Sequence, residues 1–250
     1  MRNIITGAIV AAILAILGVA TWKIFEGNSK ITDFNNWADK INSIIEKHED
    51  NGNIGDHIKG SVDAPVVIVE YADYQCEGCA SMNPKVNKAV EQSDGKLVVV
   101  YRSFLLSYHQ NATAAASAAE AAGLQGYWKE YADLLFANQS EWNYASASER
   151  TSLFKDYFMT VSDGKGDLNR FQEDIKSAAV KKKIDFDMGI GKRIDIGGTP
   201  SFYIDGQLIN WSQPDSITIN GKTITWDKSM GSEENFLKLM NDVVEAKLSK

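Results

Sequence analysis

Both cysteines of this 250-residue chain lie three positions apart, directly after a segment that is typical of a buried strand. That segment, residues 64–74, reads APVVIVEYADY and is rich in β-branched and aromatic residues. The residues after the cysteines favour a helix that begins near Cys76 and contains Pro84, and residues 96–106 favour a second strand. Strand, helix and strand in this order predict a βαβ unit with a parallel strand pair. We therefore expect an α/β protein.

Residues 109–192 favour helices throughout, which predicts a helical insertion inside this domain. Residues 111–123 are rich in alanine, the best helix former. Ser146 and Glu149 have the spacing of a capping box, a helix-start signal. A further helix is predicted over residues 167–184, where the lysine run 181–183 is expected to face solvent.

The chain returns to strand after the insertion. Asp205-Gly206 and Asn220-Gly221 are two-residue turn signals, and each predicts a β-hairpin. The second hairpin spans residues 216–226, and no function follows from it. Residues 232–248 predict a final amphipathic helix.

The N-terminus favours membrane attachment. Residues 3–22 contain no charged side chain, and about 20 apolar residues can cross a bilayer as a helix. A cleaved signal peptide is the alternative, with Gly18 and Ala20 at a possible cleavage site. The run is longer than a typical signal-peptide core, so we favour an uncleaved transmembrane anchor. Either interpretation places the rest of the chain outside the cytosol, where dithiols can stay oxidised.

Three regions are predicted from these patterns. Residues 1–26 form the anchor, with residues 4–22 in contact with lipid, and residues 27–60 form a stalk with a short amphipathic helix. Residues 61–250 form the α/β domain, including the insertion and the extra hairpin. The net charge of -7 argues against a nucleic-acid surface, because such surfaces are normally basic.

Two cysteines this close could serve as a structural disulfide, as part of a metal site, or as a redox pair. A structural zinc site normally needs four ligands, and the three histidines have no ligand spacing to each other. A disulfide that closes so short a loop stabilises the fold little. Cys76 instead lies at a predicted helix N-terminus, where backbone N–H groups stabilise a thiolate. We therefore predict a redox pair, with Cys76 as the attacking thiol, Cys79 as the resolving thiol, and no metal or organic cofactor.

The chain resembles the DsbA-like thioredoxin superfamily, in particular the membrane-attached bacterial thiol–disulfide oxidoreductases of the BdbD type. The resemblance covers roughly residues 57–210 and the final helix. The residues that carry it are VVIVEYADYQCEGC (66–79), Pro84, HQNATAAASAAEAAG (109–123) and GGTPSFYIDG (197–206). It implies a thioredoxin-like fold with a helical insertion, in addition to the N-terminal transmembrane helix.

The resemblance also implies roles for individual residues. Pro200 matches a proline that faces the disulfide after a cis peptide bond, and Thr199 would pair with an extended substrate segment. Glu70 matches a buried acid that exchanges a proton with the resolving thiol, here Cys79, although a solvent-facing glutamate is the alternative. The chain departs from relatives between the cysteines, where Glu77 should disfavour a Cys76 thiolate and Gly78 should add flexibility.

These observations favour an extracytoplasmic oxidase that introduces disulfides into exported polypeptides with free thiols. A membrane redox partner that reoxidises the dithiol is implied by the resemblance alone. A reductase or isomerase on the same fold is one alternative. A peptide-binding or chaperone-like module with an incidental disulfide is another.

Overall fold

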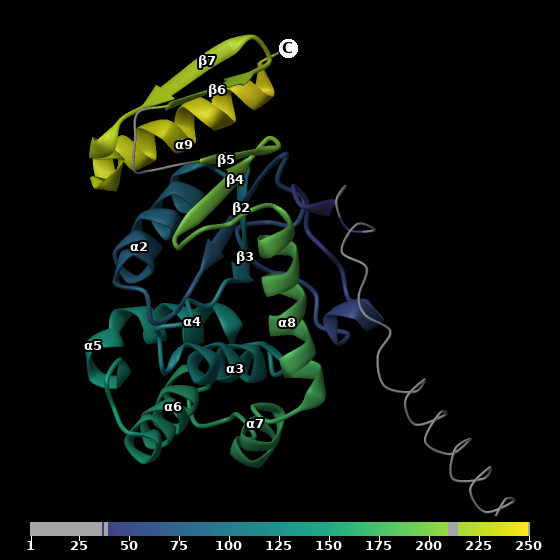
Figure 1. Cartoon of the computed structure of the whole chain (residues 1–250), viewed down its shortest axis with the longest axis vertical. Helices are drawn as coiled ribbons and strands as arrows, with labels where there is room; N and C mark the ends of the chain where they lie inside the picture. The colour runs from purple at the N-terminus through teal and green to yellow at the C-terminus, as the bar shows by residue number, and fades with distance from the viewer. Residues whose placement is uncertain (1–36, 38–39, 210–214, 250) are drawn as a thin grey trace, which may run out of the picture. The chain divides into compact units, whose positions relative to one another are not determined.

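The structure is a computed structural model that describes residues 37, 40–209 and 215–249 (Figure 1). The predicted anchor lies outside the described residues, as does the first part of the predicted stalk. Within the part of the chain that is described, no helix is both long and apolar enough to cross a membrane.

A five-stranded sheet with the order β1-β3-β2-β4-β5 forms the centre of the domain. Strands β2 and β3 are parallel, and the other neighbours are antiparallel. The α2 helix joins β2 to β3, so the predicted βαβ unit is confirmed. The strands are β1 (His57–Lys59), β2 (Val66–Ala72), β3 (Leu97–Ser103), β4 (Ser201–Ile204) and β5 (Gln207–Ile209).

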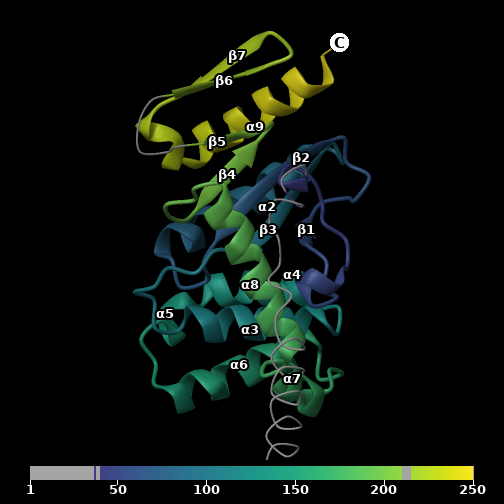
Figure 2. The ribbon, with the colours of Figure 1, turned by 45° about the vertical axis from the view of Figure 1, so that its right-hand side comes forward.

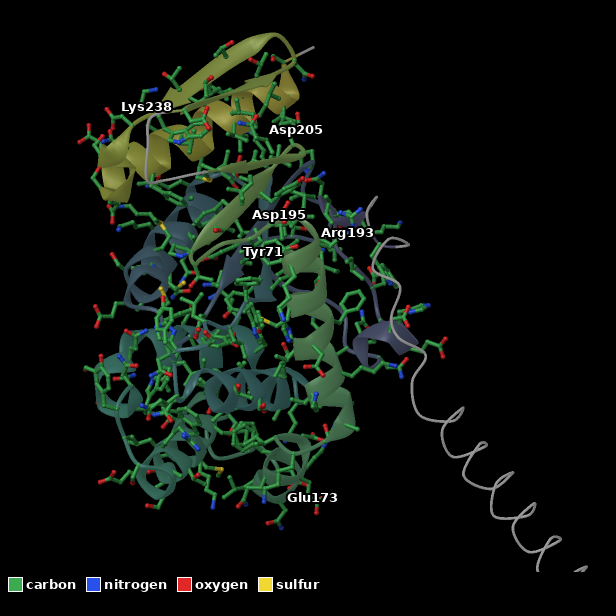
Figure 3. All side chains as sticks on the ribbon, in the orientation of Figure 1. Tyr71, Glu173, Arg193, Asp195, Asp205 and Lys238 are labelled. Atoms are coloured by element: carbon green, nitrogen blue, oxygen red, sulfur yellow. The ribbon has the colours of Figure 1, made fainter. Side chains whose placement is uncertain are left out.

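Helices cover both faces of the sheet. On one face, α2 (Glu77–Gln92) and α9 (Glu233–Leu248) pack against apolar side chains such as Ile68 and Val99. On the other face, α8 (Ala178–Arg193) packs against Val69, Tyr71 and Val100. Figure 3 labels Tyr71 beside α8, and Arg193 and Asp195 where that helix ends.

The predicted helical insertion between β3 and β4 is confirmed (Figures 1 and 2). Its alanine-rich helix α3 buries small side chains, which lets neighbouring helices approach closely. Ser146 and Glu149 form the expected capping box at the start of α6. The helices that precede α8 are α3 (Ala112–Gly123), α4 (Trp128–Ala137), α5 (Gln139–Trp142), α6 (Ala147–Val161) and α7 (Leu168–Asp174).

The single helix predicted over residues 167–184 is instead two helices. Ser177 caps the second helix by accepting a hydrogen bond from the backbone N–H of Val180, and this separates α7 from α8. The prediction that the lysine run faces solvent is wrong for Lys183, which is fully buried between Asp56 and Asp187. Three consecutive helical residues point in different directions, so one of them can turn inward.

Part of the range predicted as a stalk is packed into the domain. The helix predicted there is not found at residues 41–48, and only a short 3-10 helix, η2 (Glu49–Asn51), follows. Ile45 is buried, and its backbone exchanges hydrogen bonds of 2.8 and 2.9 Å with Asp56. Since β1 also belongs to the sheet, residues 45–60 are part of the α/β domain. The tertiary contacts of Ile45 therefore override the helical pattern predicted for this segment.

The C-terminal hairpin forms a separate two-stranded sheet from β6 (Asp215–Ile219) and β7 (Lys222–Trp226). Asn220 and Gly221 both have positive φ, 47° and 79°, as the turn requires. Figure 1 shows this hairpin lying along α9, and its buried isoleucines share a core with that helix. The 3-10 helix η3 (Lys228–Gly231) leads into α9, and Asp205, labelled in Figure 3, marks the turn between β4 and β5.

Candidate active site

The two cysteines lie where β2 leads into α2. Cys76 is the N-cap of α2 and is partly exposed, whereas Cys79 lies in the first turn and is completely buried. The backbone N–H of Cys76 donates to Asp73 O at 3.0 Å, which closes the turn before the helix. The Cys76 sulfur is therefore accessible to another molecule, whereas the Cys79 sulfur is buried in the core that includes the helical insertion.

Pro200 and Thr199 face this helix start from the loop before β4. The Thr199–Pro200 peptide bond is cis. The Cys76 Sγ lies 3.3 Å from the backbone oxygen of Thr199. A Cβ atom on Gly78 would lie only 3.2 Å from Pro200 Cδ, so the glycine provides room for this close approach. Residues that are more than a hundred positions apart thus form one surface around the exposed sulfur.

The pKa values of the two thiols are shifted in opposite directions. The pKa of Cys76 is lowered from 9.0 to about 5, chiefly by a hydrogen bond from Cys79, against the cost of burial. The backbone N–H groups of Gly78 and Cys79 also stabilise the thiolate. Burial raises the pKa of Cys79 well above its ordinary value, and the Cys76 charge raises it further. The sequence-based expectation that Glu77 disfavours the Cys76 thiolate is therefore outweighed by the hydrogen bonds at the helix start.

Glu70 is buried on β2, in the interior below the cysteines, so the solvent-facing alternative is wrong. Burial raises the pKa of Glu70 to about 7, even though the Lys59 charge acts to lower it. Lys59 is also buried, and its ammonium group donates to Asn83 and, at 3.0 Å, to Asp133. The charge of Glu70 in turn raises the pKa of Cys79. A carboxyl group that titrates near neutrality is therefore coupled to the resolving thiol.

The structure adds residues that the sequence-based reasoning missed. The Asp73 carboxylate accepts backbone N–H groups from Gln75 at 2.8 Å and Leu106 at 2.9 Å, and contacts His109 Nδ1 at 2.8 Å. It thereby fixes the cysteine turn to the loop after β3. Asp73 lies three residues before Cys76, so its position in the sequence could have identified it as a candidate site residue. Lys59, on a three-residue edge strand, carries no sequence signal.

The position of Cys76 leads to a prediction about its reactivity. We expect iodoacetamide to alkylate Cys76 at a rate that rises with a midpoint near pH 5, because only the thiolate reacts and the pKa is lowered to about 5. Cys79 should stay unmodified in the folded chain across neutral pH. The measurement is mass spectrometry of alkylated peptides as a function of pH. In a Cys79→Ala control the midpoint should rise, and a midpoint near 9 in the unmodified chain would contradict the assignment.

Within the described residues, no group of three or more His, Cys, Asp or Glu side chains is arranged to hold a metal ion. The chemistry that the site offers is that of a partly exposed thiolate, a buried thiol and a buried acid, next to the backbone carbonyl of Thr199.

Comparisons with known proteins identify the family to which the chain belongs. A family model described as thioredoxin matches residues 52–218. The sodium/proton antiporter NhaA 3 of Salinispora tropica is 33% identical over 155 residues, which are 61% of this chain and 22% of the antiporter. The chain thus spans less than a quarter of that relative's length.

Solved structures share the fold. Wolbachia pipientis α-DsbA1 matches with a TM-score of 0.56 and 22% identity, over 77% of this chain and 92% of that one. Oxidised BdbD from Bacillus subtilis matches with a TM-score of 0.57 and 17% identity, over 81% and 98% respectively. Since the family model covers most of the chain, the chain belongs to the thioredoxin family, and it shares the DsbA-like fold of these thiol–disulfide oxidoreductases.

Proposed function

We propose that the chain is an extracytoplasmic thiol–disulfide oxidoreductase that acts as an oxidase on exported polypeptides with free thiols. The observation that carries this proposal is the contrast between the two thiols at one helix start. Cys76 is partly exposed with a lowered pKa, and Cys79 is buried with a raised one. A dithiol whose reduced form is stabilised as a thiolate releases that thiolate readily and favours the oxidation of its substrates.

The reaction begins with the Cys76–Cys79 disulfide. A substrate thiolate attacks the Cys76 sulfur, the bond between the two cysteines breaks, and Cys79 leaves. Because the pKa of Glu70 is about 7, its carboxyl group can supply the proton that Cys79 takes up as it leaves. A second substrate thiolate then attacks the substrate sulfur of the mixed disulfide. The substrate disulfide forms, and Cys76 is released as a thiolate.

The backbone edge at Thr199 would hold the substrate during both steps. Its carbonyl group lies beside the Cys76 sulfur and can pair with an extended segment of the substrate. The uncharged residues 3–22 support attachment to membrane lipid on the exported side. After turnover the dithiol must be reoxidised, and a membrane redox partner is the proposed oxidant.

The equilibrium of the full chain with glutathione tests the direction of the reaction. We expect the Cys76–Cys79 disulfide to be reduced already in buffers that contain mostly oxidised glutathione, because the Cys76 thiolate stabilises the reduced form. The oxidised chain should also form a disulfide in a reduced, unfolded substrate without added oxidant. A disulfide that persists in strongly reducing buffer would instead identify a reductase. If Cys76 and Cys79 did not exchange with glutathione at all, the proposal that the chain is a thiol–disulfide oxidoreductase would be contradicted.

A further inference from the structure

A groove of about 400 Å³ opens beside the exposed sulfur, on a side of Cys76 that the mechanism above does not use. Its lining includes Gln75 and, at the helix start, Cys76, Glu77 and Gly78. The rest of the lining comes from the loop after β3 and from the loop between α5 and α6, and includes Tyr108 and Tyr144. A molecule joined to Cys76 would extend over these loops.

The two tyrosines are unusually exposed. Tyr108 is 73% and Tyr144 is 88% accessible, and the only other large exposed apolar side chains in the described residues are Val62 and Leu248. Aromatic side chains that stay in water next to a reactive atom are typical of a binding surface, where they supply contact area at low conformational cost. The exposed aromatic surface is thus concentrated at the site.

Gln75, directly before Cys76, fixes the loops that carry these tyrosines. Its side-chain amide donates to Asn143 O at 2.8 Å, one residue before Tyr144. Its side-chain oxygen accepts the backbone N–H of Asn111 at 2.6 Å, three residues after Tyr108. The backbones of the two loops that carry these rings are therefore fixed relative to the turn of Cys76 before a substrate arrives, which lowers the entropic cost of binding.

The surface around the tyrosines is acidic. Glu77 lines the groove, and a second hollow of about 570 Å³ on the other side of Tyr144 is lined by Glu141 and Glu149. Among the described residues, no lysine or arginine lines either hollow. The nearby Arg150 is bonded to the side-chain oxygen of Asn111. Carboxylates next to exposed aromatic faces form a site that attracts cations.

We propose that this groove and the adjoining hollow select substrates in which a lysine or arginine lies close to the reacting cysteine. The cationic side chain packs over the ring of Tyr144 or Tyr108, within the field of Glu77, Glu141 and Glu149. This inference rests on the proposed exchange at Cys76 and names the substrate class that it favours. The tyrosines then determine specificity, while the thiols carry the chemistry.

Two matched peptides test the inference with the full oxidised chain. Each has one cysteine, and the flanking positions carry arginine in one peptide and glutamate in the other. We expect the arginine peptide to form the mixed disulfide at least about fivefold faster at low salt, and this preference to shrink as salt rises. Tyr144→Ala and Tyr108→Ala should each reduce the preference, whereas Tyr144→Phe should retain it.

Exchange with glutathione, which carries no lysine or arginine, provides the reference rate for each variant, and the rate of each peptide is divided by it. Val62→Ala, a change at an exposed apolar side chain that lines neither hollow, should leave the preference between the two peptides unchanged. Equal rates for the two peptides, or a preference that survives both alanine variants, would overturn the inference. Absence of glutathione exchange in the unmodified chain would overturn the proposed function, and the inference with it.

Discussion

Replacing Cys76 by serine is expected to lower the rate of disulfide exchange by at least about a hundredfold at pH 7. Cys79 cannot take over, because it is completely buried and its pKa is raised well above 9. A thiol with such a pKa is less than about 1% ionised at neutral pH. The Cys76→Ser variant therefore has no thiol that is both accessible to substrate and ionised at neutral pH.

Replacing Cys79 by serine should give a different result. Cys76 keeps its exposed sulfur and its contact with Thr199, so it can still form a mixed disulfide. No neighbouring thiol remains to displace the substrate. We therefore expect a long-lived covalent complex when the Cys79→Ser chain attacks a single-cysteine substrate activated as a mixed disulfide, because neither Cys79 nor a second substrate thiol is present to break it, and no complex with Cys76→Ser.

The measurement is the initial rate of substrate oxidation by the unmodified chain and by both variants, together with non-reducing electrophoresis of the products. Circular dichroism should show that both variants keep the fold of the unmodified chain. If Cys76→Ser retained full activity on a reduced protein, the redox assignment would fail. A peptide-binding module would remain as the explanation for the groove.

Replacing Asp56 by asparagine is expected to lower the free energy of unfolding by about 3–5 kcal/mol, because it removes one partner from a buried ionic cluster. The Asp56 carboxylate lies 2.7 Å from Arg102 Nη2 and 3.0 Å from Lys183 Nζ, and all of these side chains are fully buried. Lys183 also contacts Asp187 at 2.7 Å. Loss of the Asp56 charge leaves two buried cations with one carboxylate.

The cluster joins parts of the fold that are distant in sequence. Asp56 precedes β1, Arg102 lies on β3 and Lys183 lies on α8. Arg102 also donates to the hydroxyl of Tyr71, which Figure 3 labels, at 3.3 Å. Burial alone would raise the pKa of Asp56, but Lys183 and Arg102 lower it to about 2. Its stabilising effect is therefore present above pH 3.8 and is lost as the pH falls toward 2.

Urea unfolding of the full chain, with variants in the same redox state, measures this effect. Asp185→Asn is a matched control, since Asp185 pairs with Lys181 on α8 but both side chains are exposed. That change should cost less than about 0.5 kcal/mol. Adding Lys183→Met to Asp56→Asn should lower the stability further, because it leaves the buried Asp187 carboxylate without its cation. If Asp56→Asn cost no more than Asp185→Asn, the cluster would not hold these elements together.

Much of the site could be predicted from local sequence patterns. The β-branched run before the cysteines, the turn pairs Asp205-Gly206 and Asn220-Gly221, and the capping box at Ser146 each depend on neighbouring residues alone. These signals placed Cys76 at the start of a helix and the insertion between two strands. Local chemistry decides such features because backbone conformation and side-chain periodicity are set within a few residues.

The pKa values of the site residues and the partners of the buried charged side chains could not be predicted from local sequence patterns. Glu77 is adjacent to Cys76 in sequence, yet the hydrogen bond from Cys79 is the largest cause of the lowered pKa of that thiol. Lys183 belongs to a run of lysines that is typical of an exposed helix face, but its ion pair with Asp56 is fully buried. Electrostatic energies depend on burial and on charges within a few ångströms, and only the folded chain brings together groups more than a hundred residues apart. The sequence alone therefore determined which residues could react, and the tertiary structure decided their charge states and what surrounds them.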